Sequence, residues 1–284
     1  MSEVTVRELW DQTAQLLDDR PAARWLCEVA TSADGEEFMA TLDEPVTHRM
    51  VAHLDSMLER LRTGEPLQYV LGRWGFRQLD LAIDSRVLIP RPETELVAET
   101  AIALARAIGS PVTVADLGTG SGAIGLALAD ELPHSGTTVW ITDVDADALD
   151  VARANLAGLG RAAVNVRVAQ GSWFDALPGD PRFDLIVANP PYIADGSSLL
   201  DDSVREWEPH LALFGGFDGL DDIRHLVNGA PAYLVPGGWL VLEIGADQGA
   251  LVRGLFDTAG YSEVEIRRDL AGHDRIALGR SPGR

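Results

Sequence analysis

Apolar residues recur at the spacing of amphipathic helices through the first part of the chain. Thr5 and Glu8 precede the first such run at the spacing of a helix capping box. The pattern predicts helices over residues 5–18, 21–30, 34–42 and 47–62. Gly64 and Pro66 interrupt it, and we expect residues 1–75 to form an N-terminal helical domain.

Between residues 69 and 88 the helical spacing is lost. Phe76, Leu79, Leu81 and Ile83 stand among glycine and aspartate residues, which is typical of a β-hairpin. We therefore expect residues 76–90 to be a hairpin linker.

From residue 112 onward the pattern alternates between short apolar strands and amphipathic helices. It predicts strands over 112–117, 139–143, 164–169, 185–188 and 239–244, and helices over 90–107, 122–131, 146–156, 220–234 and 248–259, with a closing hairpin at 264–267 and 275–278. This alternation indicates an α/β fold, in which a doubly wound, mostly parallel sheet is covered on both faces. We expect residues 91–284 to form this domain, with ligands bound at the carboxyl ends of its strands.

The composition excludes several kinds of chemistry. The formal charge is −21 and all 23 basic residues are arginine, so a P-loop lysine and a Schiff-base lysine are both excluded. The acidity argues against a nucleic-acid partner. It suits a basic protein partner or a cationic small molecule, although solubility explains it equally well.

Cysteine and histidine usage points to a reducing compartment and to no metal. Cys27, the one cysteine, lies in a predicted helix and is expected to be a small buried apolar residue. His48 and His53 are five residues apart and no third ligand is evident. No apolar run is long enough for a membrane helix and no signal peptide is recognisable, so we expect a cytoplasmic protein.

The first candidate site is the glycine-rich segment that follows the strand 112–117. Gly118, Thr119, Gly120, Ser121 and Gly122 join this strand to the next helix. Glycines are needed where a backbone turns sharply and a ligand approaches closely, so the segment predicts a nucleoside-containing cofactor. A tight turn without a ligand is the alternative.

Asp143 ends the next strand, where a carboxylate can accept hydrogen bonds from ribose hydroxyls. Asp143, Asp145 and Asp147 also imitate the start of a calcium loop. That interpretation fails because Ala148 and Ala154 stand where the loop needs glycine and glutamate.

A third strand ends in Asn189-Pro190-Pro191-Tyr192. Consecutive prolines stiffen the turn, so that the Asn189 side-chain oxygen and the Pro190 carbonyl can present two acceptors to the two hydrogens of a planar NH2 group. Tyr192 supplies an aromatic face. An amide or aromatic amine held in this way needs only to be aimed at an electrophilic methyl group, without a strong base.

These three segments together resemble S-adenosylmethionine-dependent N-methyltransferases. Flanking segments make the resemblance more specific. They are Pro66-Leu67-Gln68-Tyr69, Leu88-Ile89-Pro90-Arg91-Pro92-Glu93-Thr94-Glu95, Glu208-Pro209, Gly215-Gly216, Asp218-Gly219-Leu220, Leu242-Glu243-Ile244-Gly245 and Asp269-Leu270-Ala271-Gly272. From about Pro66 to Leu278 the chain resembles the release factor glutamine methyltransferases (PrmC/HemK family). The resemblance implies a Rossmann-like class I methyltransferase fold preceded by a helical substrate-recognition domain.

The implied activity is methylation of the side-chain amide nitrogen (N5) of the glutamine in the Gly-Gly-Gln motif of class-1 peptide chain release factors. S-adenosyl-L-methionine would be the methyl donor. The resemblance assigns cofactor binding to Gly118, Thr119, Gly120, Ser121, Gly122, Asp143, Trp173 and Asn189. It assigns the substrate amide to Asn189, Pro190, Pro191 and Tyr192, with Asn189, Pro190 and Tyr192 as the catalytic set.

Some residues stay unassigned at this point. Ser172 stands where many relatives carry an aspartate that can accept from the adenine amino group, and a serine accepts more weakly. Arg91, Glu93 and Glu95 either clamp the substrate or tie the two domains together, and we favour the second role. Glu243 orders either the substrate loop or only the sheet.

Three other functions remain as alternatives. An adenine-N6 methyltransferase acting on DNA or RNA would present the same NH2 group to Asn189-Pro190-Pro191-Tyr192, but it needs a basic groove. A non-catalytic nucleotide-binding module is disfavoured by that intact tetrapeptide. A dehydrogenase would share the glycine-rich segment but lacks an identifiable partner for hydride transfer.

Overall fold

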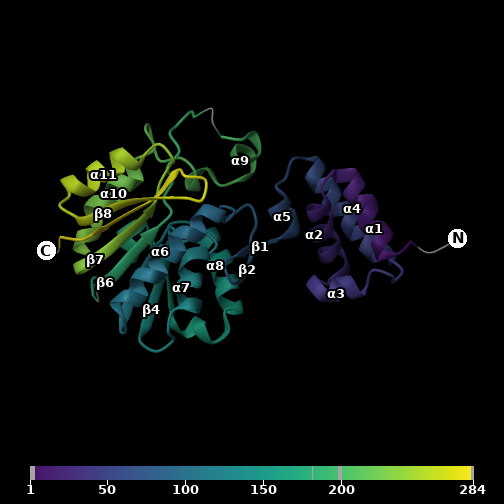
Figure 1. Ribbon diagram of the computed structural model, residues 1–284, viewed down its shortest axis with the longest axis horizontal. Coiled ribbons are helices and arrows are strands. Elements are labelled where there is room, and N and C mark those ends of the chain that lie inside the picture. Colours follow the sequence, from purple (N-terminus) through teal and green to yellow (C-terminus); the bar gives the residue numbers. More distant parts are fainter. Residues whose placement is uncertain (1–3, 181, 198–199, 283–284) are drawn as a thin grey trace. The chain divides into compact units, whose positions relative to one another are not determined.

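The computed structural model describes residues 4–180, 182–197 and 200–282, and these divide into two compact units. One unit ends at Arg73 and the other begins at Trp74. Figure 1 shows packed helices in the first unit and a sheet with helices on its faces in the second.

The first unit is a small helical bundle with its own core. Its helices are α1 (Val6–Leu17), α2 (Arg20–Thr31), α3 (Gly35–Ala40), α4 (His48–Arg62) and α5 (Leu67–Leu71). The capping box is confirmed, because the Thr5 hydroxyl accepts from the Glu8 N–H at 3.3 Å and the Glu8 carboxylate accepts from the Thr5 N–H at 2.9 Å. Cys27 is fully buried in the core, and burial raises its pKa to about 11, so it is an inert apolar residue as expected.

The second unit contains two sheets. In the part of the chain that the structure describes, strand β1 (Arg73–Phe76), whose first residue is the last of the first unit, pairs with β2 (Leu79–Ala82) in one sheet. Seven strands form the other sheet in the order β5-β4-β3-β6-β7-β9-β8. The seven are β3 (Val112–Leu117), β4 (Thr137–Asp143), β5 (Val166–Gln170), β6 (Phe183–Ala188), β7 (Leu234–Glu243), β8 (Ser262–Arg268) and β9 (Asp274–Arg280). Pairing is parallel from β5 to β7, and β9 runs antiparallel to both of its neighbours.

Helices cover this sheet on both faces (Figure 1). They are α6 (Pro92–Ile108), α7 (Ala123–Glu131), α8 (Ala146–Gly158), α10 (Asp221–Gly229) and α11 (Gly249–Thr258). A further short helix, α9 (Asp202–Trp207), has no buried residue. Helices α10 and α11 bury Leu226 and Phe256 against alternate sheet residues such as Ile186 and Leu240. The predicted doubly wound, mostly parallel fold is therefore confirmed.

Two predicted elements of the second unit differ from the structure by about five residues, and the others by fewer. The helix expected over 220–234 ends at Gly229, because Pro231 cannot continue it and starts a 3-10 turn (Ala230–Ala232). The following strand begins at Leu234 rather than residue 239, with an irregular register beside Phe183 and Leu185 that accommodates Pro236.

The register of the parallel strands brings three chain segments to one edge of the sheet. Leu117, the last residue of β3, pairs with Thr142 of β4 on one side and with Ala188 of β6 on the other. The residues that follow these strands, Gly118, Asp143 and Asn189, therefore emerge next to one another, at the point where the strand order reverses.

Within the described residues, no helix has the length and apolar character needed to cross a membrane.

Candidate functional site

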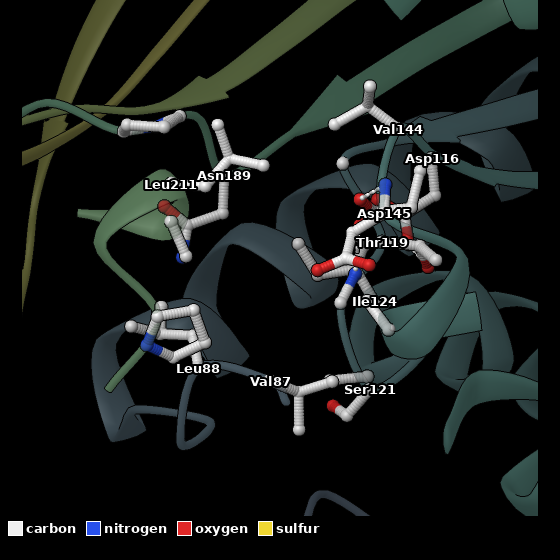
Figure 2. Close-up of a pocket in the computed structure, with 18 of the residues that line it drawn as sticks. Val87, Leu88, Asp116, Thr119, Ser121, Ile124, Val144, Asp145, Asn189 and Leu211 are labelled. Atoms are coloured by element: carbon white, nitrogen blue, oxygen red, sulfur yellow. Dashed lines mark hydrogen bonds between the residues drawn. The ribbon is translucent and has the colours of Figure 1, made fainter. Parts of the chain in front are cut away.

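A cavity of about 310 Å³ lies at the carboxyl ends of β3, β4 and β6. Figure 2 shows Asn189 and Leu211 on one side, Asp116, Thr119 and Asp145 across from them, and Val87 and Leu88 along a third side. Of the residues expected at the site, those that line the cavity are Gly118, Thr119, Gly120, Ser121, Asp143, Trp173, Asn189 and Pro191.

The glycine-rich segment forms a tight turn between β3 and α7. Gly118, Gly120 and Gly122 have φ values of 69°, 54° and 88°, a region that side chains rarely adopt. Gly122 does not itself line the cavity. Its N–H donates to the Thr119 carbonyl at 2.8 Å and closes the turn. At Gly118 and Gly120 the turn therefore brings bare backbone to the cavity wall.

Asp116, near the end of β3, is a buried carboxylate at the wall of this cavity. Its Oδ2 accepts from the Thr119 hydroxyl at 2.6 Å and from the Gly125 N–H at 2.8 Å. Its Oδ1 is buried and has no hydrogen-bond partner among the described residues. Burial raises the pKa of Asp116 to about 7, which a positive charge bound in the cavity would reverse.

Asp143 holds the glycine turn from the end of β4. Its Oδ2 accepts from the Gly120 N–H at 2.9 Å and its Oδ1 from the Asp145 N–H at 3.0 Å. Burial raises the pKa of Asp143. Each carboxylate oxygen keeps a further lone pair, so the side chain can still accept hydrogen bonds from a ligand.

The cavity is acidic. Four of its described lining residues are aspartates, at 116, 143, 145 and 222, whereas Arg86 is the one basic residue among them. Arg86 is itself paired with Asp84, at 2.6 Å. Such a lining favours a ligand that carries positive charge.

Trp173 forms another part of the wall. Its indole N–H donates to Asp222 Oδ1 at 3.0 Å, which fixes the ring plane. A Cβ on Gly118 would lie 3.1 Å from this ring, so the glycine turn and the indole are closely packed. Ser172 also lines the cavity. Asp222, the carboxylate that accepts from Trp173, also lines the cavity and was not predicted as a site residue.

The Asn189-Pro190-Pro191-Tyr192 turn is only partly at the cavity. Asn189 and Pro191 line it, whereas Pro190 is buried and, like Tyr192, is not among the lining residues. The Asn189 Nδ2 donates to the Thr94 hydroxyl at 3.4 Å. In the described part of the chain, no turn, loop or side-chain donor is hydrogen-bonded to the Pro190 carbonyl.

A glycine-rich loop supports this turn from behind. A Cβ on Gly219 would lie 2.3 Å from the Tyr192 carbonyl oxygen, and a Cβ on Gly215 would lie 2.4 Å from that of Pro191. The Gln248 side chain bridges the two segments, donating to the Tyr192 carbonyl at 2.9 Å and to the Gly219 carbonyl at 3.2 Å. The loop thus fixes the backbone of the tetrapeptide.

Arg91 and Glu208 join two walls of the cavity. The Arg91 guanidinium pairs with Glu208, which is nearly fully buried and also accepts from the Ile89 N–H at 3.1 Å. Glu95 accepts from the Arg77 N–H at 3.1 Å. The expectation that Arg91 and Glu95 tie the two domains together is wrong, because these partners belong to the second unit.

Several lining residues were not foreseen as site residues. Those contributed by the two segments that Arg91 and Glu208 join are Arg86, Val87, Leu88, Pro90, Pro209, Leu211 and Ala212. Leu211 is 62% exposed although it is apolar. The proline-flanked Arg91 and the Glu208-Pro209 pair were the only signals in the sequence that marked these walls.

Among the described residues, no group of three or more histidine, cysteine, aspartate or glutamate side chains is arranged to hold an ion.

The chain matches two protein families along its length. A methyltransferase small domain matches residues 97–208, and a PrmC N-terminal domain matches residues 9–72. Among solved structures, a methyltransferase from Pyrococcus furiosus superposes with a TM-score of 0.54 and 20% identity, covering 81% of this chain and all of that one. That likeness supports the fold alone.

Curated relatives have a much higher sequence identity to this chain. The release factor glutamine methyltransferase of Xylella fastidiosa (strain Temecula1) is 48% identical over 242 residues, which cover 85% of this chain and 86% of that protein. The protein of the same name from Vibrio cholerae is 40% identical and covers 98% of this chain and 96% of its own length. The chain therefore belongs to the release factor glutamine methyltransferase family.

Proposed function

We propose that this chain transfers a methyl group from S-adenosyl-L-methionine to the side-chain amide nitrogen (N5) of the glutamine in the Gly-Gly-Gln motif of class-1 peptide chain release factors. The observation that carries the proposal is the Asn189 side-chain amide, which faces a cavity walled by a glycine turn and Asp143. The printed name of the curated relatives supports the choice of substrate.

The cavity fits the methyl donor. The orphaned Oδ1 of Asp116 and the surplus of carboxylates suit a ligand with a sulfonium and an ammonium group. We propose that residues 118–122 cradle its methionine part, that Asp143 accepts from the ribose hydroxyls, and that Trp173 lies beside the adenine. When bound, this group supplies an electrophilic methyl carbon on a positively charged sulfur.

The Asn-Pro-Pro-Tyr turn would hold the substrate amide. An amide NH2 has two hydrogens, and we assign the Asn189 Oδ1 and the Pro190 carbonyl as their acceptors, with Tyr192 and Pro191 shaping the slot. Two observations support this assignment. No described donor is bonded to the Pro190 carbonyl, and the Asn189 Nδ2 is occupied by Thr94, which leaves the Asn189 Oδ1 as the acceptor for the substrate.

The two acceptors would also favour the reaction. An amide lone pair is delocalised toward its carbonyl, so fixing both N–H bonds returns electron density to the nitrogen and aims it at the methyl carbon. The nitrogen–carbon bond would form as the carbon–sulfur bond of the donor breaks, the sulfur would leave as a neutral thioether, and the surplus N–H proton of the cationic amide would pass to water. Preorganised acceptors stabilise the positive charge that develops on the nitrogen.

We assign recognition of the release factor to the helical unit in part, and we propose that the protein acts in the cytoplasm, where translation terminates. The formal charge of −21 supports a basic protein partner and weighs against a nucleic-acid substrate.

The test mixes the purified protein with labelled S-adenosylmethionine and a class-1 release factor, and maps the label by mass spectrometry. The same factor with its Gly-Gly-Gln glutamine replaced by alanine is the control. We expect label on that glutamine and none on the control. Label on added DNA or RNA, and not on the release factor, would instead support an adenine-N6 methyltransferase.

A further inference from the structure

Glu243 is a carboxylate with no exposed surface at the end of β7, next to the Asn-Pro-Pro-Tyr turn. Each of its oxygens accepts from one hydroxyl: Oε2 from Thr94 at 2.6 Å and Oε1 from Tyr192 at 3.2 Å. Burying an ionisable group costs free energy unless its hydrogen bonds are met. If Glu243 served only to stabilise the sheet, an apolar side chain would do so without this desolvation cost.

The Thr94 hydroxyl connects Glu243 to Asn189. A hydroxyl has one proton, and Thr94 gives it to Glu243. The Thr94 oxygen can then only accept, and it accepts from the Asn189 Nδ2 at 3.4 Å. If the Asn189 amide were reversed, its Oδ1 would face another oxygen with no hydrogen between them. The chain of donors from Asn189 to Glu243 therefore selects one orientation of the amide.

We propose that Thr94 and Glu243 are positioning residues that hold the Asn189 amide with its oxygen toward the substrate. The proposal rests on the proposed function, because the amide orientation matters only if Asn189 must accept from a substrate NH2 group. Thr94 lines the cavity, whereas Glu243 is not among its lining residues. We assign both residues a role that acts through Asn189. They decide whether the Asn-Pro-Pro-Tyr turn presents an acceptor or a donor.

Tyr192 and Arg275 fix the other end of Glu243. Arg275 Nη1 donates to the Tyr192 hydroxyl oxygen at 3.4 Å and to the Ile244 carbonyl at 3.3 Å. The Tyr192 hydroxyl is thereby left to donate its own proton to Glu243. The tyrosine of the tetrapeptide thus reaches the same carboxylate as Thr94, although it comes from a different segment of the chain.

This arrangement requires an ionised Glu243. Because Arg275 holds the Tyr192 hydroxyl as a donor to Oε1, a proton on Glu243 is placed on Oε2. The Oε2–H then donates to Thr94, Thr94 donates to Asn189, and the amide reverses. The groups that face Glu243 are Glu93 and Thr94 from α6, Tyr192 after β6, and Arg275 from β9. Burial, the largest influence, raises its pKa to about 7, with Glu93 acting in the same direction and Thr94, Arg275 and Tyr192 opposing.

The central test replaces the Thr94 hydroxyl in the full-length protein. Thr94→Val keeps the shape and removes both hydrogen bonds, whereas Thr94→Ser keeps the hydroxyl. We expect kcat for release factor methylation to fall about 10- to 100-fold in Thr94→Val, and Thr94→Ser to recover most of it. Thr100→Val, a buried threonine of the same helix that does not line the cavity, controls for loss of a hydroxyl in general.

Two further readouts separate positioning from simple structural support. Cofactor affinity, measured by calorimetry, should change by less than about threefold in Thr94→Val. The wild-type kcat should fall as the pH drops below about 7, the value that burial gives Glu243. In Glu243→Gln, kcat should be low at all pH values and should lack that step.

The outcomes distinguish this proposal from the proposed function. A wild-type protein that does not methylate the release factor overturns the proposed function and this inference with it. Active wild-type protein with equal kcat in Thr94→Val and Thr94→Ser overturns the positioning role alone. A wild-type pH step that persists in Glu243→Gln likewise contradicts the role of Glu243.

Discussion

Gly219 offers a sharp test of how the Asn-Pro-Pro-Tyr turn is held in place. Its φ is +72°, and a Cβ there would lie 2.3 Å from the Tyr192 carbonyl oxygen and 3.0 Å from the Gln248 side-chain nitrogen. The contact with the carbonyl is with backbone, which has no free end to move. Gly219→Ala must therefore displace either its own loop or the turn that contains Asn189.

Gly237 provides the matched control. Its φ is +75° and no atom lies within 4 Å of a Cβ built on it. Both substitutions cost about 1–2 kcal/mol for the left-handed backbone conformation. Only Gly219→Ala adds the overlap with Tyr192, for which overpacking costs of about 1–3 kcal/mol are typical. The two variants should thus differ in unfolding free energy by about 1–3 kcal/mol.

Urea unfolding measures this difference, and steady-state methylation of the release factor measures its effect on catalysis. A shift of the turn by a fraction of an ångström misplaces Asn189, so we expect kcat of Gly219→Ala to fall by roughly tenfold or more. Gly237→Ala should keep the wild-type kcat. Equal kcat in the two alanine variants would show that the glycine loop does not set the geometry of the turn.

Three more predictions concern the cofactor, the buried carboxylate and the partner. Asp143→Asn should weaken S-adenosylmethionine binding by about tenfold or more in calorimetry, because hydrogen bonds to a charged acceptor are lost; unchanged affinity would contradict the ribose role of Asp143. Burial in the folded state raises the pKa of Glu243 from 4.5 to about 7. Between these two pH values the folded protein therefore binds a proton at Glu243 that the unfolded chain has already released. The stability of wild type relative to Glu243→Gln should therefore fall by up to roughly 3 kcal/mol as the pH rises from 4.5 to 7, and a pH-independent difference would refute this. Finally, the association rate with the release factor should fall steeply between about 50 and 500 mM salt, and a flat dependence would argue against steering by the negative charge.

The sequence predicted the parts of the site that follow directly from strand order. Gly118, Asp143 and Asn189 each follow an apolar strand, and parallel pairing brings strand ends together, so their proximity could be foreseen. The fold class followed from the same alternation of strands and helices. The short helices α5 and α9 were missed; of the helices as short as these, only α3 was predicted, by the helix expected over 34–42.

Contacts between distant segments were beyond the reach of sequence patterns. Thr94 and Glu243 are 149 positions apart, and Trp173 and Asp222 are 49 apart. Their hydrogen bonds depend on which helix packs on which strand and at what depth. Local spacing carries no information on that packing, so the sequence does not show whether Glu243 acts on the substrate loop or only on the sheet. Leu211 was missed for the same reason, because only the fold brings its segment to the cavity.

The most direct measurement is the single-turnover rate of methyl transfer by Asn189→Ala, with saturating cofactor and release factor and with the cofactor affinity measured in parallel. Asn228→Ala, at an exposed position on α10, serves as the control. If the turn holds the glutamine amide, the Asn189→Ala rate falls by about 100-fold or more while cofactor affinity changes by less than about threefold. A rate close to that of Asn228→Ala, with intact cofactor binding, would contradict the account.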